Sequence, residues 1–215
     1  MTTRFRFLGG THPTERLCTL ADGIYAIALT LLVLDLKVPE APGISNPQLR
    51  ADLFEQLPNF IAYAVAFLVV AIFWINHHRI FRSVTVCDER ALWLNLFHLL
   101  FISLTPYMTS LIGHYKEDRI AAIMFSLNLG LSSWSLTWLA RYVLEKEAWR
   151  TKESGGAWIG IPGWAFAAGP VCAVASILLS FANITAALLL WPVLMAGYGM
   201  FLVGDGPGEQ RVKSW

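Results

Sequence analysis

The chain is dominated by apolar stretches, each about as long as a lipid bilayer is thick. A helix needs about 20 mostly apolar residues to cross the hydrocarbon core of a membrane. Six segments come close to this requirement, at residues 17–36, 59–75, 91–112, 120–143, 157–181 and 184–203. An amphipathic segment at 48–57 leads into the second of them. The pattern predicts an all-α integral membrane protein, with six transmembrane helices in a single domain over residues 1–215.

The low content of charge narrows the possible functions. Charged residues make up 14% of the chain and hydrophobic residues 56%, whereas soluble domains carry about 25% charged residues. The formal net charge of +1 creates no field that would attract nucleic acid. The three cysteines, Cys18, Cys87 and Cys172, are too widely spaced for a disulfide framework or a zinc site. We found no nucleophile elbow, P-loop or metalloprotease motif, so we expect no enzymatic activity, no metal and no cofactor.

Basic residues in the loops and termini predict the orientation of the chain. Of its 16 Lys and Arg residues, twelve fall on one side of the predicted membrane and four on the other, namely Lys37, Arg50, Lys116 and Arg119. The positive-inside rule places the side with twelve in the cytoplasm. Both termini lie on that side, which requires an even number of spans. The polar first 16 residues do not have the form of a cleavable signal peptide, so we expect the first span to act as the insertion signal.

The first predicted span carries an acidic residue within membrane depth. Asp22 lies five residues beyond Leu17, which is about 7.5 Å along a helix, and a charge within a span costs about 2.5–3.5 kcal/mol. On a helical wheel, Ile27, Leu31 and Leu34 form one apolar stripe, with Asp22 about 140° away from Ile27. We therefore expect Asp22 to face other helices and to find a hydrogen-bond donor there. A structural packing role and a role in holding a functional helix are both compatible with this position.

Polar residues also occur in the second and third predicted spans. His77 and His78 are adjacent near the end of the second span, whereas Asn95 and His98 share a face of the third. Adjacent histidines point about 100° apart and are poorly placed to chelate one metal. We expect the histidine pair to hydrogen-bond neighbouring helix ends, with one histidine donating to Asp22, and Asn95 to bridge helices. A haem site would need His98 as a deep ligand and is a less favoured alternative.

The fourth and fifth predicted spans are rich in small residues. The fourth contains the string SLNLGLSSWSLTW and the fifth contains GWAFAAGPVCAVAS. Small residues allow membrane helices to approach each other closely. These strings therefore predict a close contact between helices rather than a chemical site.

The first half of the chain resembles the transmembrane protein 175 family of potassium-permeable channels, in particular its bacterial members. The string RLCTLAD at residues 16–22 is similar to the family signature, which is Arg, three variable residues and Phe-Ser-Asp. Leu20 and Ala21 replace the Phe and the Ser, so one aromatic ring and one hydroxyl are lost from this end of the first span. Further matches are the string WINHHRIF at 74–81, the string LNL at 94–96 and Pro106. The last three spans match only in number and character.

This resemblance implies a homotetrameric potassium channel in the inner membrane of a bacterium. The first helix of each subunit would line a central pore, and the constriction would be an apolar ring rather than a carbonyl filter. By motif position, the ring would consist of Ile27, Leu31 and Leu34, which are the members of the apolar stripe. Thr30 would match the family hydroxyl that is implicated in a modest preference for potassium. The pore helix would be anchored to its neighbours by Arg16, Asp22, His77, His78 and Asn95.

One further alternative is a proton-coupled transporter that uses Asp22 and the histidines as a relay. Such a transporter needs alternating access, which is usually built on internal repeats. The sequence contains no such repeat, and this weighs against the alternative.

Overall fold

Helices form almost all of the structure, a computed structural model that describes residues 11–39, 45–115, 118–149 and 165–202. In chain order the elements are β1 (His12–Pro13), α1 (Glu15–Leu31), the short 3-10 helix η1 (Leu32–Asp35), α2 (Asn46–Glu55), α3 (Leu57–Arg82), β2 (Val86–Cys87), α4 (Glu89–His114), α5 (Arg119–Leu144), η2 (Glu147–Trp149), α6 (Ala165–Ser180) and α7 (Ile184–Leu202).

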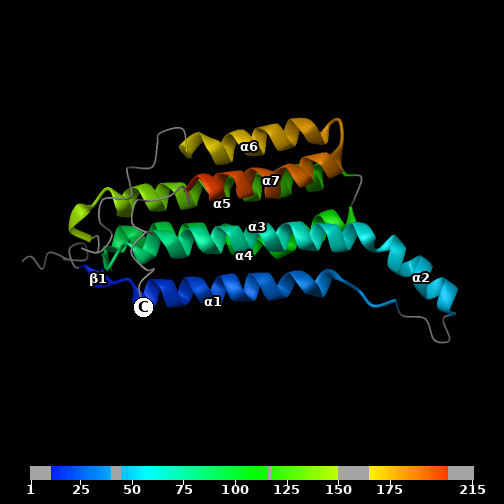
Figure 1. Cartoon of the computed structure of the whole chain (residues 1–215), viewed down its shortest axis with the longest axis horizontal. Coiled ribbons are helices and arrows are strands. Elements are labelled where there is room, and N and C mark those ends of the chain that lie inside the picture. The colour runs from blue at the N-terminus through cyan, green and yellow to red at the C-terminus, as the bar shows by residue number, and fades with distance from the viewer. Residues whose placement is uncertain (1–10, 40–44, 116–117, 150–164, 203–215) are drawn as a thin grey trace, which may run out of the picture.

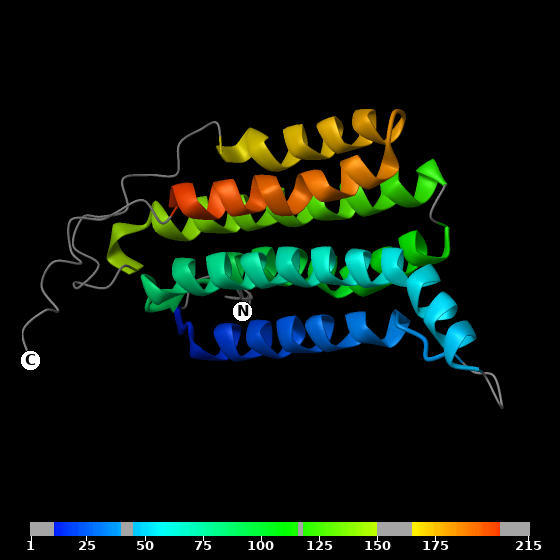
Figure 2. The ribbon, with the colours of Figure 1, turned by 45° about the vertical axis from the view of Figure 1, so that its right-hand side comes forward.

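The long helices run alongside one another in an elongated bundle (Figure 1). In Figures 1 and 2, α1 lies at one edge and α6 at the opposite edge, with the remaining long helices between them. Helix α2 projects from one end, which we call the α2 end. The opposite end, where β1 pairs with β2, is called the β1 end.

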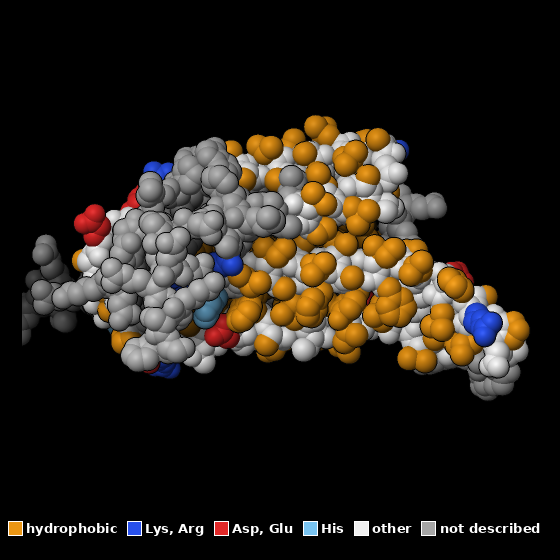
Figure 3. Space-filling model, in the orientation of Figure 1, with side chains coloured by type: hydrophobic (Ala, Val, Ile, Leu, Met, Phe, Trp, Pro, Cys, Tyr) orange, Lys and Arg blue, Asp and Glu red, His pale blue; other side chains and the backbone are white. Residues whose placement is uncertain are grey.

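Four of the described helical segments are long and apolar enough to cross a membrane: Glu15–Asp35, α3, α4 and α5. Two shorter apolar segments follow, Ala167–Ser180 and Ile184–Val193. The count of six spans therefore stays a prediction, and residues 157–164 of the predicted fifth span lie outside the described residues. In the view of Figure 3, hydrophobic side chains cover the middle of the bundle and charged side chains gather toward its ends, as expected for a surface in contact with lipid.

Helix α3 is longer than the sequence pattern predicts. It continues past the predicted end of the span at residue 75 and reaches Arg82. The hydropathy pattern marks where a helix leaves apolar surroundings, whereas the helix itself ends where its backbone hydrogen bonds end. His77 and His78 consequently lie within a helix, and their relative directions follow helical geometry.

One face of α1 is buried in the core of the bundle. Its buried residues are Leu17, Ala21, Tyr25 and Ala28, and Leu32 of η1 continues them. This spacing of three to four residues places all five side chains on one side of the helix. That side packs against α3 and α4.

Helices α5 and α6 approach each other very closely. A Cβ atom added at Gly130 of α5 would lie 2.6 Å from the Cβ of Ala173. A Cβ atom at Gly169 of α6 would lie 2.6 Å from the Cβ of Ser133. The close contact predicted from the small residues of the fourth and fifth spans is therefore confirmed.

At the β1 end, hydrogen bonds connect the start of α1 with the turn between α3 and α4. The backbone N–H of Thr14 donates to the carbonyl of Thr85 at 3.2 Å, and the Thr14 hydroxyl donates to the carbonyl of Val84 at 3.0 Å. The N–H of Thr85 donates in turn to the carbonyl of Trp149 in η2 at 2.9 Å. These bonds connect the first turn of α1 with the segment that follows α5.

Candidate functional site

The side of α1 and η1 opposite the core carries the apolar stripe identified in the sequence, with Ile27 and Leu31 on α1 and Leu34 on η1. Ile27 is 58% exposed, Leu31 44% and Leu34 71%, and Thr30 on the same side is also exposed. A Cβ atom at Gly23, which extends the stripe toward the β1 end, would meet no described atom within 4 Å. Within the described part of the chain, this apolar face thus lies open. A membrane helix with one buried face and one open apolar face is suited to contact lipid or further copies of the chain.

The hydroxyl of Thr30 is oriented by the backbone of its own helix. Its Oγ1 donates to the carbonyls of Ala26 and Ile27, at 3.0 and 2.9 Å. A hydroxyl whose hydrogen is used in this way keeps its oxygen lone pairs free. Thr30 therefore presents an oxygen acceptor on the open face of α1, between Ile27 and Leu34.

Asp22 has a hydrogen-bond donor on a neighbouring helix, as expected, but the donor is a tryptophan. The Nε1–H of Trp74 in α3 donates to Oδ1 of Asp22 at 2.8 Å. The expectation that a histidine donates to Asp22 is wrong, because the ring of His77 turns into the core and bonds elsewhere. His78 is exposed, and its ring lies beside that of Trp74 with the centroids 5.8 Å apart.

His77 and Asn95 form a direct link between α3 and α4. The Nε2 of His77 lies 2.8 Å from Oδ1 of Asn95, and both residues are buried. Because an amide oxygen only accepts, Nε2 carries the proton in this bond. Arg16 is exposed and makes no ion pair with Asp22 or with any other described residue. Of the five predicted anchoring residues, the structure thus brings only His77 and Asn95 into direct contact.

A second polar link joins α1 to α4 and α5, and the sequence analysis missed it. Nδ1 of His98 lies 3.1 Å from the carbonyl oxygen of Ser132 and 3.0 Å from Oγ of Ser135. A carbonyl only accepts, so Nδ1 carries a proton, and in the neutral ring Nε2 accepts the hydroxyl of Tyr25 at 2.6 Å. The sequence signal that could have predicted this link is Tyr25 itself, because a buried tyrosine hydroxyl usually has a hydrogen-bond partner.

The contacts of His98 bear on the alternative of a haem site. Both ring nitrogens of His98 are hydrogen-bonded within the bundle, so this ring is not free to act as an axial haem ligand. Among the described residues, there is also no group of three His, Cys, Asp or Glu side chains that could hold a metal ion. The polar residues around α1 instead fix one helix to its neighbours.

Comparisons with known proteins match the same part of the chain. The family described as endosomal/lysosomal potassium channel TMEM175 matches residues 16–106, which include nearly all of α1, all of α2 and α3, and most of α4. A potassium channel from Chryseobacterium sp. is 35% identical over 139 residues, covering 64% of this chain and 68% of the relative. A potassium channel from Streptomyces collinus is 40% identical over 120 residues, covering 54% of this chain and 57% of the relative. The chain thus spans little more than half the length of this second relative.

More distant relatives and a solved structure agree with this match. The endosomal/lysosomal proton channel TMEM175 of Gallus gallus is 34% identical over 122 residues, covering 52% of this chain and 24% of the relative. The crystal structure of a lysosomal potassium-selective channel TMEM175 homolog from Chamaesiphon minutus has a TM-score of 0.69 and 25% identity. That similarity covers 89% of this chain and 98% of the solved one. These matches show that the chain belongs to the TMEM175 family.

Proposed function

We propose that the protein is a potassium-permeable cation channel, formed by four copies whose α1 helices surround a central pore. The observation that carries this proposal is the open face of α1 and η1, where Ile27, Leu31 and Leu34 are exposed on the same side as the Thr30 hydroxyl. The opposite face is held to α3 and α4 by packing and by hydrogen bonds. Membership of the TMEM175 family and the names of the bacterial relatives support the same function.

The apolar stripe would close the pore without any charge at the constriction. Four apolar side chains around a narrow axis exclude water, and a dewetted segment blocks ions. Opening then requires the α1 helices to rotate or move apart until the ring admits water. The hydrogen bonds that hold the back of α1 would define the closed position from which this movement starts.

Thr30 would supply the preference for potassium. Four hydroxyl oxygens around the axis offer weak ligands to a partly hydrated cation, and potassium loses its hydration shell more easily than the smaller sodium ion. Because hydroxyls replace only part of the hydration shell, the preference would be modest beside that of a carbonyl filter.

The same proposal assigns an orientation to the bundle. The β1 end would face the cytoplasm, because most of the basic residues belong to loops and termini on that side. The α2 end would face the opposite side of a bacterial inner membrane. Helices α6 and α7 would complete six spans, so that the amino and carboxyl termini lie on one side.

Ion flux into liposomes that contain the purified protein tests the pore assignment. We expect Thr30→Ala to lower the ratio of potassium to sodium flux several-fold, because the ring of oxygen ligands is lost. Ile27→Asn should raise the flux of both ions, since a polar ring keeps the constriction hydrated. Ser103→Ala is the matched control, because Ser103 is also exposed and its hydroxyl also donates to its own helix. If both α1 variants behave like the control, α1 is not the pore helix.

Proton conduction is a second candidate, because the vertebrate relative is described as a proton channel. It can be measured in the same liposomes with an internal pH indicator and a proton gradient as the sole driving force. A proton flux that needs no other solute would support a channel that also conducts protons. A proton flux that appears only when a second solute is transported would instead favour a proton-coupled transporter, and would contradict the channel proposal.

A further inference from the structure

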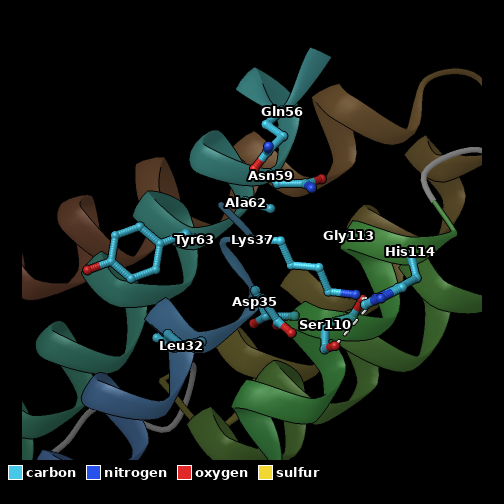
Figure 4. Close-up of a pocket in the computed structure, with 11 residues that line it drawn as sticks. Leu32, Asp35, Lys37, Gln56, Asn59, Ala62, Tyr63, Ser110, Gly113 and His114 are labelled. Atoms are coloured by element: carbon cyan, nitrogen blue, oxygen red, sulfur yellow. Dashed lines mark hydrogen bonds between the residues drawn. The ribbon is translucent and has the colours of Figure 1, made fainter. Parts of the chain in front are cut away.

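A polar cavity lies at the α2 end, between η1 and the adjoining ends of α3 and α4. Its volume is about 320 Å³, and its wall includes Asp35, Lys37, Asn59, Ser110 and His114. Figure 4 shows the Lys37 side chain extending across this cavity, with its ammonium end close to Ser110 and His114. The cavity therefore holds a positive and a negative side chain in a small space.

An apolar groove adjoins this cavity. The groove also has a volume of about 320 Å³ and lies between the start of α3, the end of α4 and the start of α7. Its wall is mainly aliphatic and includes Leu57, Ile61, Ile112, Leu188 and Leu189. The polar cavity and the groove share three lining residues, Asn59, Ala62 and Gly113. These three residues, which we call the shared wall, border both a charged compartment and an apolar one.

The charged compartment has unused hydrogen-bonding capacity. Within the described residues, neither Asp35 nor Lys37 has an ion-pair partner. The Oδ1 of Asn59 is buried and accepts no hydrogen bond from the described chain. It lies 3.8 Å from the position that a Cβ of Gly113 would occupy, and thus at the shared wall. A buried acceptor without a donor destabilises the structure, so a bound group with hydrogen-bond donors would be favoured here.

We propose that the cavity and the groove together bind one phospholipid whose headgroup is zwitterionic and carries N–H donors, as in phosphatidylethanolamine. The phosphate would lie against Lys37, and the primary ammonium would donate to Asp35 and Asn59. One acyl chain would occupy the apolar groove beside α7. A small water-soluble zwitterion would satisfy the cavity alone and would leave the groove empty.

The position of the site favours a lipid over other amphiphiles. It lies where η1 ends and α3 begins, at one end of the helices that are long enough to cross a membrane. Headgroups gather at this depth, with the acyl chains extending toward the middle of the bundle. A phosphatidylcholine headgroup has no N–H donor, and a phosphatidylglycerol headgroup has no cation. Phosphatidylcholine therefore has no donor for the Asn59 oxygen, whereas the hydroxyls of phosphatidylglycerol could donate but would leave the charge of Asp35 without a cation.

Native mass spectrometry of the purified full chain tests this proposal. The protein is incubated in detergent with phosphatidylethanolamine, phosphatidylcholine or phosphatidylglycerol of identical acyl chains. We expect phosphatidylethanolamine to occupy one site per chain, at several times the occupancy of the other two lipids. Asp35→Asn, which keeps the shape of the side chain, should remove most of this preference. Gly113→Leu should fill the shared wall and lower the occupancy of all three lipids.

The control variant is Glu55→Gln, which removes a neighbouring carboxylate that lines neither compartment. It should keep the lipid preference of the unmodified chain. A thermal melt of each variant ensures that only folded protein is compared, and Asp35→Asn tests the proposal even if Gly113→Leu does not fold. Equal occupancy of the three lipids would overturn the proposal. An unchanged preference in Asp35→Asn, or displacement of the lipid by soluble glycerophosphoethanolamine, would also overturn it.

Discussion

Single polar side chains hold α1 against the rest of the bundle, and each of them bonds to a different helix. Asp22 accepts from Trp74 of α3, whereas the hydroxyl of Tyr25 donates to His98 of α4. Hydrogen bonds between membrane helices contribute about 0.6 kcal/mol each on average. Two such bonds are therefore strong enough to bias the rotation of α1 without locking it, which suits a helix that would have to move.

The bond between Trp74 and Asp22 can be tested by removing its donor alone. Trp74→Phe keeps an aromatic ring but loses the indole N–H, so the carboxylate of Asp22 loses the donor that it has in the described chain. We expect the free energy of unfolding in detergent to fall by about 0.6 kcal/mol. Trp93→Phe is the matched control, because Trp93 is exposed on α4 and makes no hydrogen bond with the described residues. Equal melting temperatures for the two variants would show that the bond does not stabilise the fold.

We expect the carboxylate of Asp88 to make the stability of the fold sensitive to acid. It caps α4 at the β1 end, outside the membrane-spanning segments. Burial alone would raise its pKa, but hydrogen bonds from Lys146, Tyr142 and the N–H of Ala91 outweigh burial, and the pKa lies below its ordinary value of 3.8. A carboxyl with a lowered pKa stabilises the folded state above its ordinary pKa. That stabilisation is lost as the pH falls through the pKa of the folded state.

We therefore expect the melting temperature to fall as the pH is lowered from about 6 to about 3, and Asp88→Asn to reduce this fall. Asparagine can still cap the helix, but it removes the ionised partner of Lys146, which lies 2.8 Å away. Asp52→Asn on α2 is the control, since its carboxylate has no partner among the described residues. The melting temperature of each variant is measured by circular dichroism in detergent. If Asp88→Asn and the control follow the same curve, Asp88 does not contribute to the acid sensitivity.

The sequence predicted the open stripe of α1 well but predicted the partners of its polar residues poorly. Ile27, Leu31 and Leu34 share a face because helical periodicity is a property of one segment. The partner of Asp22 depends on how α3 is rotated and on its height relative to α1. Neither quantity is encoded within α1 itself, so Trp74 could not be distinguished from the nearby histidines.

At the scale of the helices, the contact between α5 and α6 leaves no room for side chains at two positions. Glycine at 130 and 169 lets the two backbones approach until no Cβ atom fits between them. Small residues of this kind were readable from the sequence, because close helix packing in a membrane needs them. The residues at which the helices end were harder to predict from the sequence. Hydropathy marked the part of α3 that lies in apolar surroundings and not the last turns up to Arg82.

Gly130→Ala tests the closeness of this contact with a single methyl group. The new Cβ would lie 2.6 Å from the Cβ of Ala173, so one helix must shift. We expect a loss of stability of about 1–3 kcal/mol, as for other overpacked contacts. Gly113→Ala makes the same chemical change where the nearest atom, Oδ1 of Asn59, is 3.8 Å away, and it should be nearly neutral. Thermal melts in detergent compare the two variants, and a neutral Gly130→Ala would mean that α5 and α6 are not packed this closely.

At the scale of the whole molecule, the important feature is that apolar side chains pack the middle of the described bundle. Buried side chains from α1, α3, α4 and α5 form one continuous apolar cluster, which includes Tyr25, Phe73, Leu99, Phe125 and Leu129. A water-filled path along this interior would require the core to be emptied. The open face of α1 is instead available to meet other copies, and a ring of copies would close the surface that one chain leaves exposed.

A cysteine placed on this face distinguishes a central pore from a lipid-facing surface. If four α1 helices surround an axis, Leu34→Cys places four thiols within reach of one ion, and soft metal ions such as Cd²⁺ bind thiolates tightly. Micromolar Cd²⁺ should then block potassium flux through this variant and leave the unmodified chain, with its own three cysteines, unaffected. Leu178→Cys is the matched control, because Leu178 is similarly exposed on α6 at the far edge of the bundle. Block of both variants or of neither would place the axis of the assembly elsewhere, because only a residue that faces its own copies can assemble such a metal site.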